Sequence, residues 1–143
     1  DIGALKAEIL RNILFRSVEV EIEAITKELT IQNAHRLLKG ADFVIDTFDN
    51  SFSRALVKQI CEDDGYECLH IGLYADYCEV IWNAEYRVPK DVAGDVCEYP
   101  LARNLVLLAV AIASEVIVEY FLQGIQRNVS ATLGDFAVRA IET

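Results

Sequence analysis

Two carboxylates and an arginine are grouped near the middle of the chain. Asp46 and Asp49 directly follow the apolar run 43–45, and Arg54 comes shortly after them. Carboxylates at the end of a strand can hold a Mg²⁺ ion that bridges nucleotide phosphates. An arginine in the first turn of the next helix adds positive potential. A second interpretation fits equally well, in which Asp49 and Asn50 cap that helix while Arg54 pairs with Asp46.

The periodicity of apolar residues predicts the elements that must position this group. Four segments have helical spacing of apolar residues or a capped apolar run, which predicts helices. Five more have alternating apolar residues or a short apolar run, which predicts strands. The predicted helices are 4–15, 30–38, 50–64 and 101–122. The predicted strands are 18–23, 43–45, 68–71, 77–82 and 134–141. Alternating helices and strands in the first half predict a parallel α/β sheet, and the strand-rich second half predicts antiparallel additions.

Composition and charge restrict the classes of function. The chain has 143 residues and a net charge of −10, from 13 basic and 23 acidic side chains. The length leads us to expect one domain. The charge leads us to expect no nucleic-acid partner, because an acidic surface repels phosphate backbones. The longest apolar run, 105–113, is shorter than the roughly 20 residues that a membrane span requires. We expect no membrane association.

The cysteines indicate neither a metal site nor a disulfide framework. There are 4 of them, and none forms the CxxC pair of a structural zinc site. We therefore do not expect a zinc site. We expect the thiols to be free and the protein to be cytoplasmic. Cys97 precedes the long helix, where its thiol could act as a nucleophile, but Asp95 and Glu98 beside it disfavour the thiolate. An inert thiol is the preferred interpretation, and for His70 we expect a satisfied buried histidine.

Two motifs together resemble a known family. The pattern Asp46-x-x-Asp49-Asn50-x-x-x-Arg54 at the end of an apolar strand resembles the motif of the ThiF/MoeB/HesA family, the ubiquitin-activating-enzyme-like adenylyltransferases. The segment Asp1-x-Gly3-x-x-Lys6-Ala7 is similar to the family's D-x-G-x-x-K-A segment. The order and spacing of the two motifs, and the long late helix with its small residues, extend the resemblance over nearly the whole chain.

The resemblance implies a fold, a reaction and a set of site residues. The fold would be a Rossmann-like three-layer domain, with a mostly parallel sheet and antiparallel strands in the C-terminal half. The reaction would use ATP and Mg²⁺ to activate the C-terminal carboxylate of a ubiquitin-like or sulfur-carrier protein as an acyl adenylate. Lys6 would contact the phosphates, Asp49 would hold Mg²⁺ beside Asp46, and Asn50 and Arg54 would shape the nucleotide pocket. A homodimer or heterodimer is expected.

The sequence also departs from the family pattern. It contains no G-x-G-x-x-G loop, Phe48 stands where threonine is usual, and the family's zinc-binding cysteine pairs are absent. We therefore expect residues 1–143 to form a single truncated domain, lacking the N-terminal βαβ portion and supplying only part of the ATP site. The alternative is a non-catalytic Rossmann-like subunit or binding module of a heterodimeric activating enzyme. A nicotinamide-dependent dehydrogenase is less well supported, because no histidine or arginine is suitably placed for hydride transfer.

Overall fold

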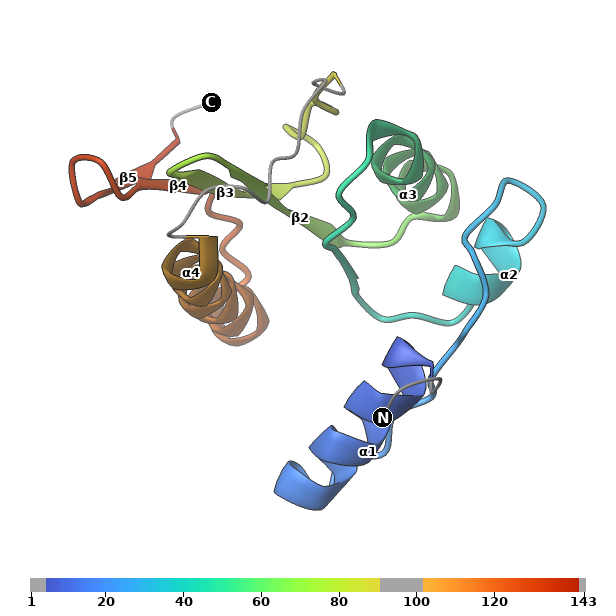
Figure 1. The fold of residues 1–143 in the computed structure, drawn as a ribbon. Helices are drawn as coiled ribbons and strands as arrows, with labels where there is room; N and C mark the ends of the chain where they lie inside the picture. Colours follow the sequence, from blue (N-terminus) through green and yellow to red (C-terminus); the bar gives the residue numbers. More distant parts are fainter. Residues whose placement is uncertain (1–4, 91–101, 142–143) are drawn as a thin grey trace.

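The computed structural model describes residues 5–90 and 102–141, and it places a five-stranded sheet between helices (Figure 1). The strands are adjacent in chain order: β1 (Val44–Asp46), β2 (Cys68–Tyr74), β3 (Tyr77–Trp82), β4 (Val129–Thr132) and β5 (Ala137–Ala140). Strands β1 and β2 pair in parallel, and the three later pairings are antiparallel. The predicted mixed α/β sheet is confirmed, although its parallel part within the described residues is limited to one pairing.

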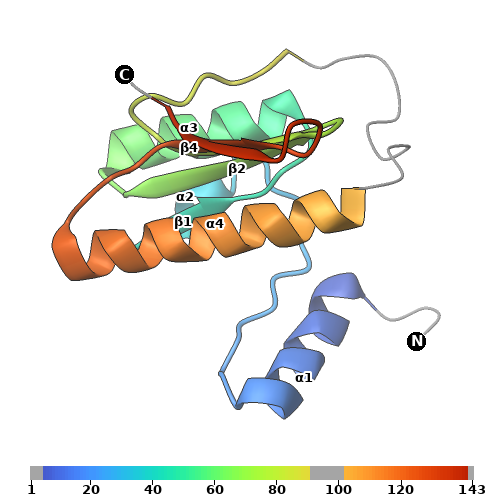
Figure 2. The ribbon, with the colours of Figure 1, turned by 90° about the vertical axis from the view of Figure 1, so that its left-hand side faces the viewer.

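Helices cover both faces of the sheet. Helix α3 (Ser51–Asp64) lies on one face and helix α4 (Ala102–Gln123) on the other, as two perpendicular views agree (Figures 1 and 2). On the α3 side, Val57 and Cys61 pack against Val44 and Cys68. The α4 side holds a larger cluster, whose buried members are Leu69, Val80, Trp82, Ala113, Val116 and Val129. These two cores give the expected three layers, with the end of β1 between them.

Helix α3 has clear start and stop signals. The Asn50 side chain accepts a hydrogen bond from the Ser53 amide at 2.8 Å, which satisfies one of the free N–H groups of the first turn. Gly65 ends the helix with a φ of 73°, a left-handed conformation that glycine adopts without strain. The predicted helix and its boundaries are therefore confirmed, and they fix where the residues after β1 lie.

The N-terminal part departs most from the sequence-based expectation. Helix α1 (Lys6–Val18) forms but has no buried residue, and α2 (Ala34–Leu38) is shorter than predicted and packs beside α3. The predicted strand 18–23 is wrong, because Val18 ends α1 and the residues after it have no strand partner. Alternating side chains favour a strand only where a neighbouring strand takes up the backbone hydrogen bonds. In both ribbon views α1 lies outside the three layers (Figures 1 and 2).

Strand β4 was missed by the sequence pattern. Its residues Val129–Thr132 alternate buried and half-buried positions, but the strand is short and contains Ser130 and Thr132. Pairing with β3 on one side and β5 on the other supplies its hydrogen bonds. Strand β2 also continues to Tyr74, beyond the predicted end at residue 71.

Helix α4 is longer than the apolar run that we identified from the sequence. By length and composition, Arg103–Gln123 could cross a membrane, with a mean hydropathy of 2.2. A mostly buried core helix can have the same length and composition, but only 22% of the apolar window of α4 is buried. The buried side chains, Leu105, Ala109, Ala113 and Val116, face the sheet. Its opposite side leaves large apolar side chains exposed, namely Val106, Leu107, Val110, Val118, Phe121 and Leu122.

Candidate functional site

A short turn connects the end of β1 to the start of α3. Asp46 is the last residue of β1, and its Oδ1 accepts a hydrogen bond from the Phe48 amide at 2.9 Å. Asn50 then caps α3. Between them, Asp49 is exposed, and its Oδ1 accepts a long hydrogen bond of 3.3 Å from the Asn50 side chain. The turn therefore presents one carboxylate to solvent at the tip of β1.

Asp46 lies inside the protein. It is 1% exposed, and its Oδ2 lies 2.7 Å from Nδ1 of His70 and 3.9 Å from Nη1 of Arg54. With Oδ1 bound to the Phe48 amide, both carboxylate oxygens have partners within the chain. A buried carboxylate is stable only with such compensation. Asp46 therefore bonds to the turn from inside the protein, whereas Asp49 is exposed to solvent.

Arg54 is also buried and engaged. It is 7% exposed, and it donates from Nη1 to the Tyr86 hydroxyl and from Nη2 to the Ile71 carbonyl, each at 2.9 Å. These bonds join α3 to β2 and to the segment after β3. The second sequence-based interpretation is thus partly realised, because Arg54 lies near Asp46 and Asn50 caps α3, while Asp49 stays exposed.

His70 connects these groups, and it is fully buried as expected. Its Nδ1 faces Asp46, and its Nε2 lies 2.7 Å from Oδ1 of Asn83. Its ring stacks on Tyr86 with centroids 3.8 Å apart and an angle of 8° between the planes. Burial raises the pKa of the Tyr86 hydroxyl, and the Arg54 guanidinium partly offsets that rise. We call Asp46, Arg54, His70, Asn83 and Tyr86 the buried polar network.

The thiols around this network are core residues. Cys61, Cys68 and Cys78 are free and buried. The hydrogen bond between Cys61 and Cys68 lowers the pKa of the Cys61 thiol and raises that of the Cys68 thiol. Burial also raises the pKa of Cys68, and it raises that of Cys78. A raised pKa makes a thiol a poor nucleophile near neutral pH. Cys97 lies outside the described residues.

Lys6 is positioned differently from the other sequence-predicted site residues. It is the first residue of α1 and is exposed, on the helix that lies outside the three layers (Figure 2). Asp46, Asp49, Asn50 and Arg54 are instead brought together at the β1–α3 turn. The structure therefore groups four of the five predicted residues and leaves Lys6 on a separate element.

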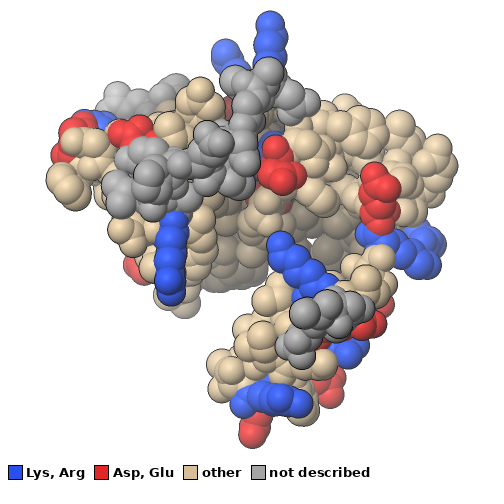
Figure 3. Space-filling model, viewed as in Figure 1, with Lys and Arg blue, Asp and Glu red and all other residues tan. Residues whose placement is uncertain are grey.

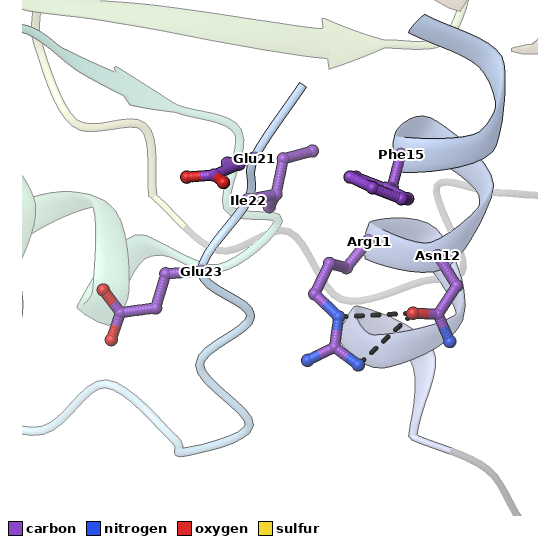
Figure 4. Close-up of a pocket in the computed structure, with 6 residues that line it drawn as sticks. All are labelled: Arg11, Asn12, Phe15, Glu21, Ile22 and Glu23. Atoms are coloured by element: carbon purple, nitrogen blue, oxygen red, sulfur yellow. Dashed lines mark hydrogen bonds between the residues drawn. The ribbon is translucent and has the colours of Figure 1, made fainter. Parts of the chain in front are cut away.

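An open groove of about 660 Å³ lies next to α1 rather than at the turn. Phe15 of α1 and Ile22 of the following extended segment point toward each other across it, and Arg11 bonds to the Asn12 side chain (Figure 4). The remaining lining residues are Glu21 and Glu23. This groove contains none of the residues of the β1–α3 turn.

Charge and ligand chemistry limit what the turn can bind. On the face shown in Figure 3, acidic and basic side chains are scattered between uncharged areas. Within residues 5–90 and 102–141, no three His, Cys, Asp or Glu side chains are grouped to hold a metal. A Mg²⁺ ion usually needs only one or two carboxylates, with phosphates and water as its other ligands. The exposed Asp49 carboxylate fits that requirement, and the enclosed Asp46 carboxylate does not.

Comparison with known proteins decides the family. The model of the ThiF family matches residues 1–102, which is more than half of the chain and includes the whole β1–α3 turn. The chain belongs to the ThiF family. The two motifs at Lys6 and at Asp46–Arg54 both lie within the matched residues, so the resemblance found in the sequence is confirmed.

Individual relatives of this ThiF-family chain are more distant. The SAMP-activating enzyme E1 of Haloferax volcanii is 28% identical over 78 residues, which cover 52% of this chain and 28% of that enzyme. Among solved structures, Escherichia coli MccB matches with a TM-score of 0.72 at 13% identity. PaaA matches with a TM-score of 0.66 at 14% identity.

These structural matches establish the Rossmann-like α/β fold alone. They cover 99% of this chain, but only 48% of MccB and 56% of PaaA. The chain thus spans about half the length of the solved structures that it resembles, and about a quarter of the curated relative. The predicted Rossmann-like α/β class is confirmed, but the described sheet is not mostly parallel, because one strand pairing is parallel and three are antiparallel.

Sequence reasoning missed the role of Asn83. It lies 37 positions after Asp46, and nothing in its local sequence marks it as part of a polar network. Because β3 pairs antiparallel with β2, the end of β3 lies beside the start of β2. The Asn83 amide there donates a hydrogen bond to the Cys68 carbonyl at 3.0 Å. That placement is a product of strand register. A sequence pattern could not have located it.

Proposed function

We propose that this chain supplies part of the ATP and Mg²⁺ site of an adenylyltransferase, which activates the C-terminal carboxylate of a ubiquitin-like or sulfur-carrier protein. The observation that carries the proposal is the exposed carboxylate of Asp49, held at the tip of β1 above the buried polar network. Ligands of open α/β sheets gather at the carboxyl ends of strands, where Asp49 lies.

The chemistry of adenylation matches the groups at the turn. A carboxylate oxygen of the carrier protein attacks the α-phosphorus of ATP, and the P–O bond to pyrophosphate breaks. Mg²⁺, when bound, neutralises charge on the phosphates. Asp49 would hold that ion, Asn50 would present the N-terminus of α3, and Lys6 would contact the phosphates. Asp46 and Arg54 would act from within the protein, by fixing the shape of the nucleotide pocket.

The relatives support a protein or peptide substrate. The curated relative is named for activating SAMP, and structures of MccB contain ATP or MccA. Membership of the ThiF family agrees with activation of a ubiquitin-like protein in general. We propose the same class of substrate for this chain.

We propose further that the chain acts as a homodimer or heterodimer in the cytoplasm. The exposed apolar side of α4 is suited to a protein partner. Within the described residues the three cysteines are free, which agrees with a reducing compartment. Since residues 1–143 contain no G-x-G-x-x-G, they would supply only part of the ATP site. Light scattering of the full-length protein, alone and with any co-purifying subunit, tests the assembly.

One observation favours a non-catalytic module as a second candidate. Of the residues in the D-x-x-D-N-x-x-x-R motif, Asp46 and Arg54 are both enclosed by internal contacts. They could serve the fold of a subunit that has kept the architecture and lost the chemistry. In that case the chain would bind its partner without exchanging pyrophosphate into ATP.

An ATP–pyrophosphate exchange assay separates the two candidates. The full-length protein is assayed with a carrier protein that ends in Gly-Gly, as wild type, Asp49→Ala and the exposed control Asp42→Ala. We expect Asp49→Ala to lower exchange by about a hundred-fold, which corresponds to about 2.7 kcal/mol of transition-state stabilisation. Asp42→Ala should retain activity. No exchange by the wild type, or undiminished exchange by Asp49→Ala, would reject the adenylyltransferase.

A further inference from the structure

The turn that presents Asp49 depends on a chain of two hydrogen bonds. The Phe48 amide donates to Oδ1 of Asp46, and Oδ2 of the same carboxylate lies 2.7 Å from Nδ1 of His70. The first bond holds the turn between Asp46 and Phe48, just before Asp49. The second keeps the Asp46 carboxylate in the orientation that the first requires. His70, on the neighbouring strand β2, is therefore linked to the turn through the Asp46 carboxylate.

The His70 ring is itself fixed from three directions. Nδ1 faces Asp46, Nε2 faces Oδ1 of Asn83 at 2.7 Å, and Tyr86 lies flat on the ring. The Asn83 amide nitrogen points to the Lys58 carbonyl at 3.4 Å, which orients its oxygen toward the histidine. Both ring nitrogens thus lie within hydrogen-bond distance of side-chain oxygens, Oδ2 of Asp46 and Oδ1 of Asn83.

Arg54 forms an ion pair with Asp46 but no hydrogen bond to it. Its Nη1 lies 3.9 Å from Oδ2, beyond hydrogen-bond length, and its short bonds go to Tyr86 and Ile71. Without His70, the Asp46 carboxylate would keep the hydrogen bond from the Phe48 amide and the longer ion pair with Arg54, and its Oδ2 would lose the partner at 2.7 Å. A buried carboxylate oxygen that loses its close donor turns to find another partner.

We propose that His70 is a positioning residue for the nucleotide site: through Asp46 it fixes the turn at Phe48 and so places Asp49 at the tip of β1. This role rests on the proposed function and adds a residue from a different strand. His70 is fully buried, so its effect on the site would pass through Asp46.

Amide hydrogen exchange of the 143-residue chain tests the positioning without any ligand. The variants are His70→Leu, which removes the donor, and His70→Gln, which keeps one at similar size. His35→Leu is the matched control, since His35 is the other histidine of the chain and lies exposed beside Asp64. In His70→Leu, we expect the Phe48 amide to exchange at least about ten-fold faster, while the Val80 amide in the β3 ladder changes little. His70→Gln should restore most of the protection.

The second measurement uses the exchange assay of the full-length protein. His70→Leu should raise the half-saturating Mg²⁺ concentration by about ten-fold, as expected for a residue that orients a metal ligand. The KM for the carrier protein should stay unchanged, and His70→Gln should return the Mg²⁺ dependence toward that of the wild type. His35→Leu should behave as wild type in both experiments.

The outcomes are distinguishable. If Phe48 and Val80 lose protection equally, or if both His70 variants unfold, His70 is a general core residue and the proposal is overturned. Unaltered Phe48 protection in His70→Leu overturns it as well. If the wild type itself exchanges no pyrophosphate, the proposed function fails, and the amide data alone decide whether His70 fixes the turn.

Discussion

The aromatic ring of Tyr86 lies parallel to the imidazole of His70, with 3.8 Å between the ring centroids. The same tyrosine accepts a hydrogen bond from Arg54 through its hydroxyl. One side chain from the segment after β3 therefore touches both α3 and β2. Through these contacts it closes the buried polar network beneath the tip of β1.

Replacing Tyr86 by phenylalanine should destabilise the protein without altering the stack on His70. The Arg54 Nη1 group would lose its 2.9 Å acceptor in a buried position. We expect a decrease of about 1–3 kcal/mol in the free energy of unfolding, measured by urea denaturation near neutral pH. Tyr74→Phe, at an exposed tyrosine of β2, is the control and should change stability little. Equal effects of the two variants would contradict the importance of the hydroxyl contact.

The same tyrosine should make stability fall at alkaline pH. Burial raises the pKa of Tyr86 above its ordinary value of 10.0. When the pH rises past that ordinary value, the unfolded chain loses the proton while the folded chain keeps it. The unfolded state then binds fewer protons, so stability decreases with rising pH. This contribution is complete below the ordinary value and disappears as the pH passes the raised value.

Urea denaturation of wild type and Tyr86→Phe at several pH values isolates this effect. Other tyrosines, lysines and thiols titrate in both proteins, so the difference in their unfolding free energies reports on Tyr86. We expect the advantage of the wild type to shrink between about pH 9 and about pH 11. A constant advantage would show that Tyr86 ionises as readily in the folded protein as in the unfolded chain, and a growing advantage would show that it ionises more readily there.

The cap of α3 should contribute measurably to stability. Asn50→Ala removes the acceptor of the 2.8 Å bond from the Ser53 amide. We expect a loss of about 1 kcal/mol in the free energy of unfolding. Asn50→Asp keeps an oxygen at the same position and should restore the cap. If both variants unfold at the wild-type urea concentration, the cap contributes nothing.

Residues 1–143 alone should bind ATP weakly. Phosphate groups are held most strongly by a glycine-rich loop that leads into a helix N-terminus, and this sequence contains no such loop. We expect calorimetric titration with ATP and Mg²⁺ to give a dissociation constant in the millimolar range or weaker. A micromolar constant for this chain would show that the described elements form a complete nucleotide site.

The sequence predicted elements best where the signal was local. Helix α3 was bounded correctly because Asn50 and Gly65 act on their own turn of the backbone. Strand β3 was predicted over its observed range because its alternating residues face the core on one side only. The strand expected at 18–23 failed because alternation says nothing about whether a neighbouring strand exists.

The candidate site was predicted in part for the same reason. Asp46, Asp49, Asn50 and Arg54 are close in sequence, so one turn brings them together in any fold that keeps β1 and α3. The sequence did not show which of the two carboxylates is buried. That depends on His70, which reaches Asp46 only because β2 pairs in parallel beside β1.

By itself, the sequence determined the family, the mixed α/β class and the local order of β1, the turn and α3, because these follow from motifs, caps and periodicity within a few residues. Tertiary structure decided which side chains of the motif are buried and which is exposed. It enclosed Asp46 and Arg54 with His70, Asn83 and Tyr86, and it left Asp49 exposed. The physical reason is that burial and hydrogen-bond partners come from strand register and packing, which join residues far apart in the chain.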